Sequence, residues 1–243
     1  MANGDSLKNI RVVLCATSHP GNIGAAARAM KTMGLEALYL VRPRRFPDAE
    51  AEGRASRATD VLAHATVCES LADALHGVGL SVACSARARD IAVPAVSARE
   101  AAERIVAASQ SQPAALVFGN ETYGLTGAEV NQCNLLASIP ANPAYSSLNL
   151  AAAVQVLCYE VRIAATAAVA PVPARVLATH DEVEGFYAHL ERVMVDVGFL
   201  DPSHPKKLVP RVRRLFGRAA LEQEEVNILR GLLKALGEPR RRG

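Results

Sequence analysis

The chain has no long hydrophobic run, and this absence excludes the simplest kind of membrane protein. Among its 243 residues no apolar stretch approaches the roughly 20 residues that a membrane-spanning helix needs. The opening residues, MANGDSLKN, contain no apolar signal region either. We therefore expect a cytoplasmic protein without a membrane partner.

Cysteine pairs and glycine fingerprints are also missing. The cysteines are five in number, and none forms a C-x-x-C pair: Cys15, Cys68, Cys84, Cys133 and Cys158. This argues against a disulfide framework and against a zinc site. The chain lacks a G-x-G-x-x-G after its first apolar run and a G-K-[ST] sequence, which argues against dinucleotide binding and against a P-loop. No metal set, Ser-His-Asp order or Cys-His pairing is apparent.

The positive charge is concentrated at the C-terminal end. The whole chain carries a net charge of +3, whereas residues 204–243 hold eleven Lys or Arg against four Asp or Glu, a net charge of +7. The rest of the chain therefore carries −4, and the contrast indicates an anionic partner, with nucleic acid as the first candidate. For residues 238–243 a solvated basic tail is the simpler interpretation. Residues 206–218 differ, because apolar and basic residues alternate there at helical spacing.

Five short apolar runs predict the strands of one sheet: residues 10–15, 37–41, 80–86, 114–119 and 135–141. Segments of helical composition follow them at 22–33, 52–64, 70–75, 98–109, 127–133 and 150–165. Continuously apolar strands separated by helices are typical of an α/β fold, a parallel sheet with helices on both faces. We expect this domain at 1–168 and a proline-containing linker at 169–177.

Residues 178–243 are predicted to form a small helical extension. The segments 182–200 and 221–236 are amphipathic, and in the second of them an apolar stripe is formed by Val226, Leu229, Leu233 and Leu236. We expect this stripe to be buried, either within the extension or against a partner subunit.

Polar side chains follow three of the predicted strands, where ligands of parallel sheets bind. They are Asn22 and Arg28 after the first, Asn120 and Glu121 after the fourth, and Ser146, Ser147 and Asn149 after the fifth. Gly21 and Gly24 would permit a tight turn into the first helix. Each group also has a structural interpretation: a paired or snorkelling arginine, a helix-capping glutamate, and helix capping by Ser or Asn. His19 is interpreted as a loop residue.

Three long motifs identify a family resemblance. SHPGNIGAAARAMKTMG, LVFGNETYGLT and IPANPAYSSLNLAAAVQV, in this order and spacing, resemble the motifs of the TrmH-type branch of the SPOUT RNA methyltransferases. The tail, with FYAHLERV and RRLFGRA followed by NILRGLL, resembles that of tRNA ribose 2′-O-methyltransferases of this branch that act on cytidine or uridine at position 32. The resemblance covers nearly the whole chain.

The resemblance implies a C-terminal trefoil knot in the α/β domain, S-adenosylmethionine as cofactor without a metal, and tRNA as substrate. The implied cofactor contacts are Cys84, Ser85, Ala86, Gly119, Asn120, Ile139, Ser146, Ser147 and Leu148. The implied catalytic residues are Arg28, Asn22, Glu121, Ser147 and Asn149. The implied RNA contacts are Arg28, Lys206, Lys207, Arg211, Arg213, Arg214 and Arg218. Members of the family act as homodimers with the active site at the subunit interface.

The chemistry of Arg28 favours a role in binding phosphate over a role as the general base that removes the ribose proton. A guanidinium does not normally lose its proton in a protein, but it binds phosphate bidentately. We hypothesise that Arg28 holds a phosphate beside the target ribose, that Glu121 orients Arg28, and that Asn22 and Asn149 hold Arg28 and the ribose. Target choice would lie outside the three motifs, in the extension and in loops such as 42–50.

Three other functions fit parts of the sequence. One is a 2′-O-methyltransferase acting on another tRNA position or on ribosomal RNA, and the tail argues against it. Another is a non-catalytic RNA-binding protein, and the intact polar motif residues argue against that. The last is a nucleotide-dependent oxidoreductase, and the missing glycine fingerprint argues against it.

Overall fold

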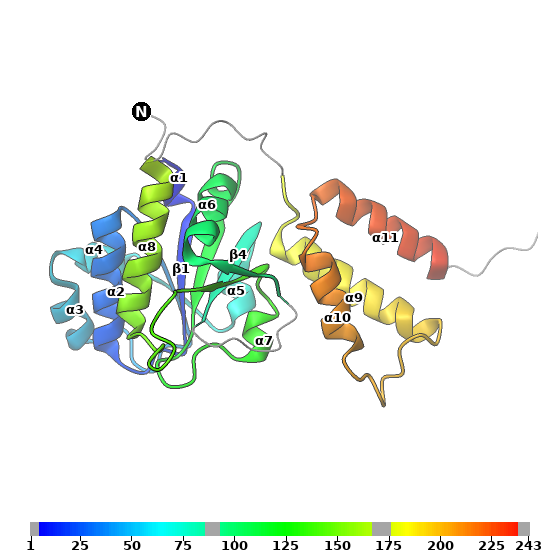
Figure 1. Ribbon diagram of the computed structural model, residues 1–243, viewed down its shortest axis with the longest axis horizontal. Helices are drawn as coiled ribbons and strands as arrows, with labels where there is room; N and C mark the ends of the chain where they lie inside the picture. Colours follow the sequence, from blue (N-terminus) through cyan, green and yellow to red (C-terminus); the bar gives the residue numbers. More distant parts are fainter. Residues whose placement is uncertain (1–4, 86–92, 167–175, 238–243) are drawn as a thin grey trace, which may run out of the picture.

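A single parallel sheet organises the N-terminal part of the chain, and helices enclose it (Figure 1). The computed structural model describes residues 5–85, 93–166 and 176–237. The strands are β1 (Ile10–Cys15), β2 (Ala37–Val41), β3 (Thr66–Cys68), β4 (Leu80–Cys84), β5 (Ala95–Ser97), β6 (Ala114–Phe118) and β7 (Leu135–Ser138). They pair in the order β3-β2-β1-β6-β4-β7-β5, and every pairing is parallel.

The helices follow the strands closely in sequence. In the sheet domain they are α1 (Asp5–Lys8), α2 (Pro20–Met33), α3 (Ala49–Ala55), the 3-10 turn η1 (Ser56–Ala58), α4 (Thr59–Ala63), α5 (Leu71–Leu75), α6 (Ala98–Ser109), α7 (Gly127–Val130) and α8 (Leu150–Thr166). Beyond them lie α9 (His180–Asp196), α10 (Leu208–Gly217) and α11 (Gln223–Gly237). No helix in these described ranges is long and apolar enough to cross a membrane.

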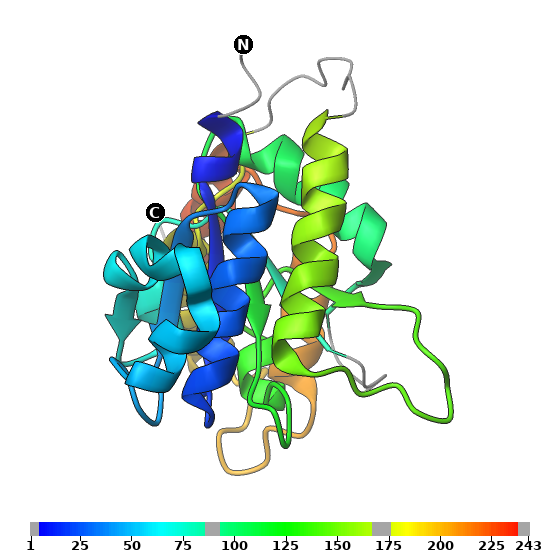
Figure 2. The same ribbon diagram turned by 90° about the vertical axis from the view of Figure 1, so that its left-hand side faces the viewer.

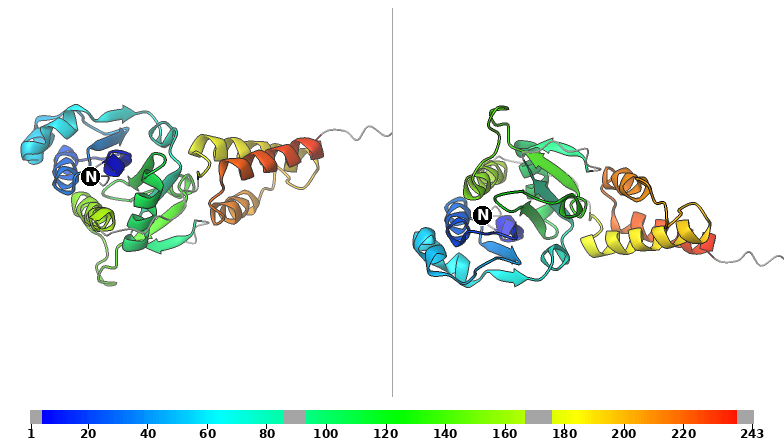
Figure 3. Two further views of the ribbon diagram at one scale, coloured as in Figure 1. Left: turned by 90° about the horizontal axis from the view of Figure 1, so that it is seen from above. Right: turned by 90° about the horizontal axis from the view of Figure 1, so that it is seen from below.

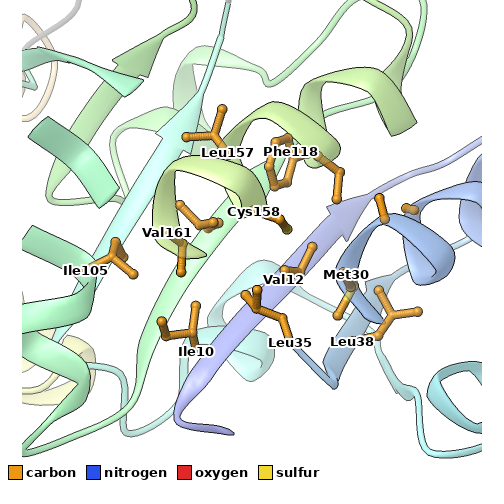
Figure 4. Close-up of a cluster of buried hydrophobic side chains, with 14 of the residues drawn as sticks. Ile10, Val12, Met30, Leu35, Leu38, Ile105, Phe118, Leu157, Cys158 and Val161 are labelled. Atoms are coloured by element: carbon orange, nitrogen blue, oxygen red, sulfur yellow. The ribbon is translucent and has the colours of Figure 1, made fainter. Parts of the chain in front are cut away.

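Alternate residues of each strand enter two separate cores, as a sheet covered on both faces requires. Val12 and Leu14 pack with α2, α6 and α8 in the larger core, which Figure 4 shows around Met30, Leu157 and Val161. Val13 and Cys15 pack on the other face with residues of α5 and α7. The predicted α/β class with helices on both faces is therefore confirmed.

The sequence underestimated the size of the sheet. β3 and β5 extend it from five strands to seven, and each has only three residues, TVC and AVS. Runs this short carry no recognisable apolar pattern, and both lie at the edges of the sheet, where burial is weakest. The helix predicted at 52–64 is broken into α3, η1 and α4, and Ser56 at the first break has a positive φ of 55°.

Gly24 has a different role from the predicted turn. It lies inside α2, where a Cβ atom would meet the backbone of Ala51 in α3. The missing side chain therefore allows α2 and α3 to approach each other closely. The turn from β1 into α2 is completed before this glycine, because the helix already begins at Pro20.

The three C-terminal helices have a core of their own beside the sheet domain (Figure 3). Phe186 of α9 meets Phe216 of α10 edge to face, with ring centroids 4.9 Å apart. Val226 and Leu233 of α11 are buried in this core, but Leu236 is 60 % exposed, so the predicted stripe is only partly buried. The reason is helix geometry: Leu236 lies about 80° around the axis of α11 from Val226, at the margin of the buried stripe.

The start of the extension is pinned by a short backbone pairing. Ala178 donates its N–H to the Leu221 carbonyl at 2.8 Å, and Leu177 bridges to Glu222. Most of the predicted linker 169–177, namely residues 169–175, lies outside the described residues. The division at 168 and 178 stays a prediction, although residue 177 already pairs within the extension.

The close approach of α2 and α3 predicts a stability difference between two glycines. We expect Gly24→Ala to lower the free energy of unfolding by about 1–3 kcal/mol, because the new methyl group overpacks against the Ala51 backbone. Gly53→Ala is the matched control, since nothing lies within 4 Å of its Cβ position. It should be neutral or stabilising by up to about 1 kcal/mol. Urea unfolding of both variants measures this, and equal effects would contradict the packing argument.

Candidate functional site

The carboxyl ends of β4, β6 and β7 surround a cavity of about 170 Å³. Its lining comes from the segments after these strands and from the start of α8, which meet at the lower edge of the sheet in Figure 1. Eight of the nine predicted cofactor residues line it: Cys84, Ser85, Gly119, Asn120, Ile139, Ser146, Ser147 and Leu148. The ninth, Ala86, lies outside the described residues. The predicted convergence of these loops at one sheet edge is thus observed.

The floor of the cavity depends on Gly119. A Cβ atom at this position would meet the backbone of Gly124 and Leu125, so the loop after β6 can fold back only over a glycine. The fold-back is closed by the Gly124 N–H, which donates to the Asn120 carbonyl at 2.8 Å. Gly124 itself has a φ of +70°, the left-handed region that glycine tolerates best.

The Asn120 side chain is occupied by the protein itself. It is only 7 % exposed, and its amide nitrogen donates to the Ala16 carbonyl and to the Ser18 hydroxyl, both at 2.7 Å. Its amide oxygen accepts the Thr122 N–H at 2.8 Å. The side chain of Asn120 therefore holds the loop after β6 to the loop after β1 through hydrogen bonds. A cofactor would contact mainly the backbone of Asn120.

A directed chain of three side chains joins the polar loops. The Asn149 amide nitrogen donates to the Asn22 amide oxygen, and the Asn22 amide nitrogen donates to a carboxylate oxygen of Glu121, both at 3.0 Å. Because an ionised carboxylate can only accept, Glu121 sets the direction of the whole chain. The segments that carry Glu121 and Asn149 are joined in this way to Asn22, which lies 99 and 127 residues earlier in the sequence.

Glu121 also receives two backbone groups from the entry to α2. Its carboxylate oxygens accept the N–H of Ser18 at 2.9 Å and of His19 at 3.2 Å. Partial burial alone would raise the pKa of Glu121, but the hydrogen bonds from Asn22, Ser18 and His19 outweigh it and hold the pKa below its ordinary value. Glu121 is therefore a carboxylate at neutral pH, and a helix-capping role, one of the structural alternatives, is part of its function.

Arg28 does not take part in this chain. It lies six residues after Asn22 on α2, which places it about 9 Å along the helix and about 120° around its axis. Its side chain is exposed, and within the described chain no hydrogen bond or ion pair joins it to Glu121. The hypothesis that Glu121 orients Arg28 is therefore wrong within one subunit, because Glu121 is bound to Asn22 and to the α2 entry.

The serines before α8 are not needed to cap the helix. Asn149 alone does this, since its side-chain oxygen accepts the Ala151 N–H at 2.9 Å and its carbonyl accepts the Ala153 N–H at 2.9 Å. Ser146 and Ser147 instead line the cavity. In Figure 2 the segment between β7 and α8 that carries them projects from the body beside the N-terminal end of α8.

Sequence reasoning missed two groups of this site. The backbone N–H groups of Ser18 and His19 bind Glu121, and Thr122 and Tyr123 contribute to the cavity lining. Backbone donors leave no signal in the residue types, although the position of His19 just before Pro20 marks a helix start. Among the residues that the structure describes, no group of three or more His, Cys, Asp or Glu could hold a metal ion.

The basic residues of the extension divide into two kinds. Lys206, Lys207, Arg211, Arg214 and Arg218 are exposed on and around α10. Arg213 points inward: its guanidinium donates to both oxygens of Glu184, at 2.7 and 2.8 Å, and lies 4.4 Å from the centre of the Tyr187 ring. The Tyr187 hydroxyl donates to the Arg213 carbonyl at 3.2 Å. Arg213 therefore joins α10 to α9.

The fold and the cavity together define an α/β protein that binds a ligand beyond the carboxyl ends of its strands. Comparison with known proteins gives the particular group. The chain belongs to the SpoU rRNA Methylase family, whose model matches residues 9–159. The model of the C-terminal domain of the tRNA methyltransferase TrmJ matches residues 181–243. The predicted membership of the TrmH-type branch of the SPOUT methyltransferases is confirmed, and the tail matches the TrmJ C-terminal domain.

Individual relatives agree with this assignment. The chain is 49 % identical over 240 residues to the tRNA (cytidine/uridine/adenosine-2′-O-)-methyltransferase TrmJ of Pseudomonas aeruginosa, covering 93 % of each chain. Its structure resembles the crystal structure of TrmJ from Z. mobilis ZM4 with a TM-score of 0.82 and 30 % identity, covering 94 % of this chain and 99 % of that one. A more distant AdoMet-bound rRNA methyltransferase from Sinorhizobium meliloti has a TM-score of 0.51 and 25 % identity, covering 63 % of this chain and 56 % of that one.

The lowered pKa of Glu121 predicts a pH dependence of stability. Because the folded-state pKa lies below the unfolded value of about 4.5, the stabilisation is complete above that value and is lost as the pH falls through the folded-state pKa. Acidification from about pH 7 to about pH 3.5 should therefore destabilise the wild type more than Glu121→Gln, which carries no titrating carboxyl. Urea unfolding at both pH values measures this. A parallel loss of stability in the two proteins would contradict the assignment.

The two neighbouring arginines of α10 are expected to respond differently to the same substitution. Arg213→Met should lower the stability of the chain by about 1–2 kcal/mol, because the bidentate pair with Glu184 and the contact with Tyr187 are both lost. Arg214→Met should change stability by less than about 0.5 kcal/mol, since Arg214 is exposed. Thermal unfolding distinguishes the two variants, and equal midpoints would show that the Glu184 pair contributes nothing.

Proposed function

We propose that this protein transfers a methyl group from S-adenosylmethionine to the ribose 2′-hydroxyl of tRNA, at the cytidine or uridine in position 32 of the anticodon loop. The observation that carries the proposal is that Glu121, the last acceptor of the Asn149–Asn22–Glu121 chain, lines the loop-lined cavity. The match of residues 181–243 to the TrmJ C-terminal domain favours tRNA over ribosomal RNA. The 49 % identity to a TrmJ enzyme favours catalysis over RNA binding alone.

The cavity suits S-adenosylmethionine by its chemistry. Leu148, Leu150 and Ala153 offer an apolar surface for a base, while Ser85, Ser146 and Ser147 supply hydroxyl and backbone groups for polar atoms. The nearby carboxylate of Glu121 favours a ligand that carries positive charge. When bound, this cofactor supplies a methyl group activated by a positively charged sulfur. The AdoMet-bound relative from Sinorhizobium meliloti supports the same cofactor here.

A trefoil knot is part of the proposal. β4 lies between β6 and β7, so the chain that follows β7 emerges beside the loop that leaves β4. Threading of the segment 139–149 through that loop would wrap both segments around the cavity that they line. The middle of the loop, residues 86–92, lies outside the described residues, so the knot rests on family membership and on the strand order.

The residues of the site would act mainly by positioning. Holding the ribose 2′-oxygen in line with the methyl group converts the reaction to an effectively intramolecular one, which can supply several kcal/mol of barrier reduction. Asn149 and Asn22 would offer their amide groups to the ribose, and Ser147 is an exposed residue that lines the cavity. Arg28 would clamp an adjacent phosphate, and the ribose proton would pass to that phosphate or to water.

A homodimer would bring Arg28 to the cavity. Arg28 is exposed on α2 and points away from its own polar chain, so it is available to a site on another copy. Tyr159 and Ile163 of the neighbouring α8 are 49 % and 43 % exposed, which provides apolar surface for such a contact. In this arrangement each active site would combine the cavity of one subunit with Arg28 of the other.

The exposed basic residues of α10 would bind tRNA phosphates. Arg211, Arg214 and Arg218 recur at intervals of three and four residues, so they lie along one side of the helix and its end. Phosphate contacts of this kind give salt-dependent affinity without sequence specificity. Arg213 would support them indirectly by fixing α10 to α9.

Labelled S-adenosylmethionine and unmodified tRNA transcripts test the proposal. We expect a 2′-O-methyl group at position 32, located by nuclease digestion and mass spectrometry. Transfer to another nucleotide would keep the reaction and overturn the target position. Absence of transfer despite measurable binding of cofactor and tRNA would favour a non-catalytic RNA-binding protein.

Replacement of Arg28 by lysine separates bidentate binding from charge alone. We expect Arg28→Lys to lower turnover by about 10- to 100-fold, because an ammonium group cannot reproduce the two parallel hydrogen bonds to phosphate. Cofactor affinity should be unchanged, since the proposed clamp binds a phosphate of the RNA and not the cofactor. Single-turnover kinetics and equilibrium dialysis measure these two quantities. Near-full turnover of the lysine variant would overturn the clamp.

A further inference from the structure

The loop between β2 and α3 is the strongest feature that the proposed function leaves unused. Its sequence, RPRRFPD, places three arginines directly after the carboxyl end of β2: Arg42, Arg44 and Arg45. β2 pairs with β1, and β1 leads into the loop that binds Glu121. The arginine-bearing loop therefore starts one strand away from the catalytic edge.

Backbone hydrogen bonds tie this loop to the site. The Arg44 N–H donates to the Thr17 carbonyl at 3.0 Å, and Thr17 is followed by Ser18, whose N–H binds Glu121. On the other side, the Arg42 N–H donates to the Cys68 carbonyl at 3.0 Å. The loop is thus held by backbone hydrogen bonds at Arg42 and at Arg44. The segment that contains Thr17 and Ser18 binds both Arg44 and Glu121, so it fixes the distance between the loop and Glu121.

The arginines of this loop are open to solvent. Arg42 has a φ of 45°, which is uncommon for a residue with a side chain. Arg42, Arg44 and Arg45 are all exposed. Phe46 packs against the hydrophobic core and so fixes the far end of this basic stretch.

Few acidic side chains lie close enough to these arginines to neutralise their charge. Arg45 approaches Asp48 and Glu50 only at 3.8 and 3.9 Å, and Asp48 already accepts the Glu50 N–H as the cap of α3. Arg42 and Arg44 form no ion pair or side-chain hydrogen bond with the residues that the structure describes. Two unpaired guanidinium groups on an anchored loop are suited to bind an anion, and phosphate is the anion that arginine binds best.

We infer that Arg42 and Arg44 bind the RNA phosphates that flank the target nucleotide. The inference rests on the proposed function and deepens it, because it assigns a second RNA-contacting surface that is separate from α10. The α10 arginines belong to the extension, whereas Arg44 is one hydrogen bond from the loop that holds Glu121. Arg42 and Arg44 would therefore set the register of the substrate backbone at the active site, and α10 would bind more distant phosphates.

The test uses the single variants Arg42→Gln and Arg44→Gln in the full chain. The matched control is Arg104→Gln, which removes the same charge from an exposed position of α6 where Arg104 pairs only with Glu100. We expect KM for tRNA to rise about three- to tenfold in each loop variant, with kcat within about twofold of wild type. The slope of log KM against log salt concentration should fall by about 0.7–0.9 for each lost phosphate contact. Cofactor affinity and the control variant should match wild type.

A short anticodon stem-loop substrate locates the contact. If the loop binds phosphates beside the target, the same rise in KM should be seen with this hairpin as with whole tRNA. If KM rises with whole tRNA but not with the hairpin, Arg42 and Arg44 do not bind phosphates beside the target nucleotide. A KM equal to that of Arg104→Gln, in an enzyme that methylates tRNA, would overturn the inference alone. Failure of the wild type to transfer a methyl group would instead overturn the proposed function.

Discussion

The Glu121 carboxylate is the interaction on which the rest of the site depends. It is an acceptor only, and it gathers the Ser18 and His19 N–H groups at the entry to α2 and the Asn22 amide. These bonds fix the direction of the Asn22 amide, which then fixes that of Asn149 at the start of α8. One charge therefore joins the loops after β1 and β6 to the segment after β7, and Glu121 itself lines the cavity. Hydrogen bonds to a charged group are stronger than those between neutral groups, so the arrangement is rigid without a metal ligand set in the described chain.

The same geometry would explain why the active site proposed here needs a second subunit. With Asn22 directed toward Glu121, helix periodicity turns Arg28 about 120° away and toward solvent. A phosphate bound by Arg28 on that side of α2 would lie beside a cofactor cavity only if another copy of the chain places its own cavity there. Homodimerisation and catalysis would then follow from one structural fact, the position of Asn22 and Arg28 on a single helix. The anchored arginines of the β2–α3 loop fit this account because they extend the positively charged surface along the same sheet edge.

Most of the architecture was predictable from residue pattern, and the failures have identifiable causes. The long apolar strands and α2, α6 and α8 were recognised because burial on a sheet face leaves a continuous apolar run. β3 and β5 were missed because three residues at a sheet edge carry no such pattern. Gly24 was assigned to a turn because its contact with Ala51 belongs to tertiary packing. The residues that line the cavity were predicted through family resemblance, whereas the partner of Glu121 and the inward position of Arg213 depend on side-chain directions that a single sequence does not encode.

The sharing of the active site between two copies is the central claim, and mixing of two inactive variants tests it directly. One variant, Arg28→Ala, keeps its cavity, and the other, Ala153→Phe, fills the cavity but keeps Arg28. Each is expected to be inactive alone and to fold as the wild type does by circular dichroism. If Arg28 acts on the cavity of the partner subunit, random mixing should restore about a quarter of the wild-type methyl transfer, since half the dimers are mixed and one of their two sites is complete. Activity that stays at the level of the separate variants, in a sample where exchange of subunits is demonstrated, would contradict the account.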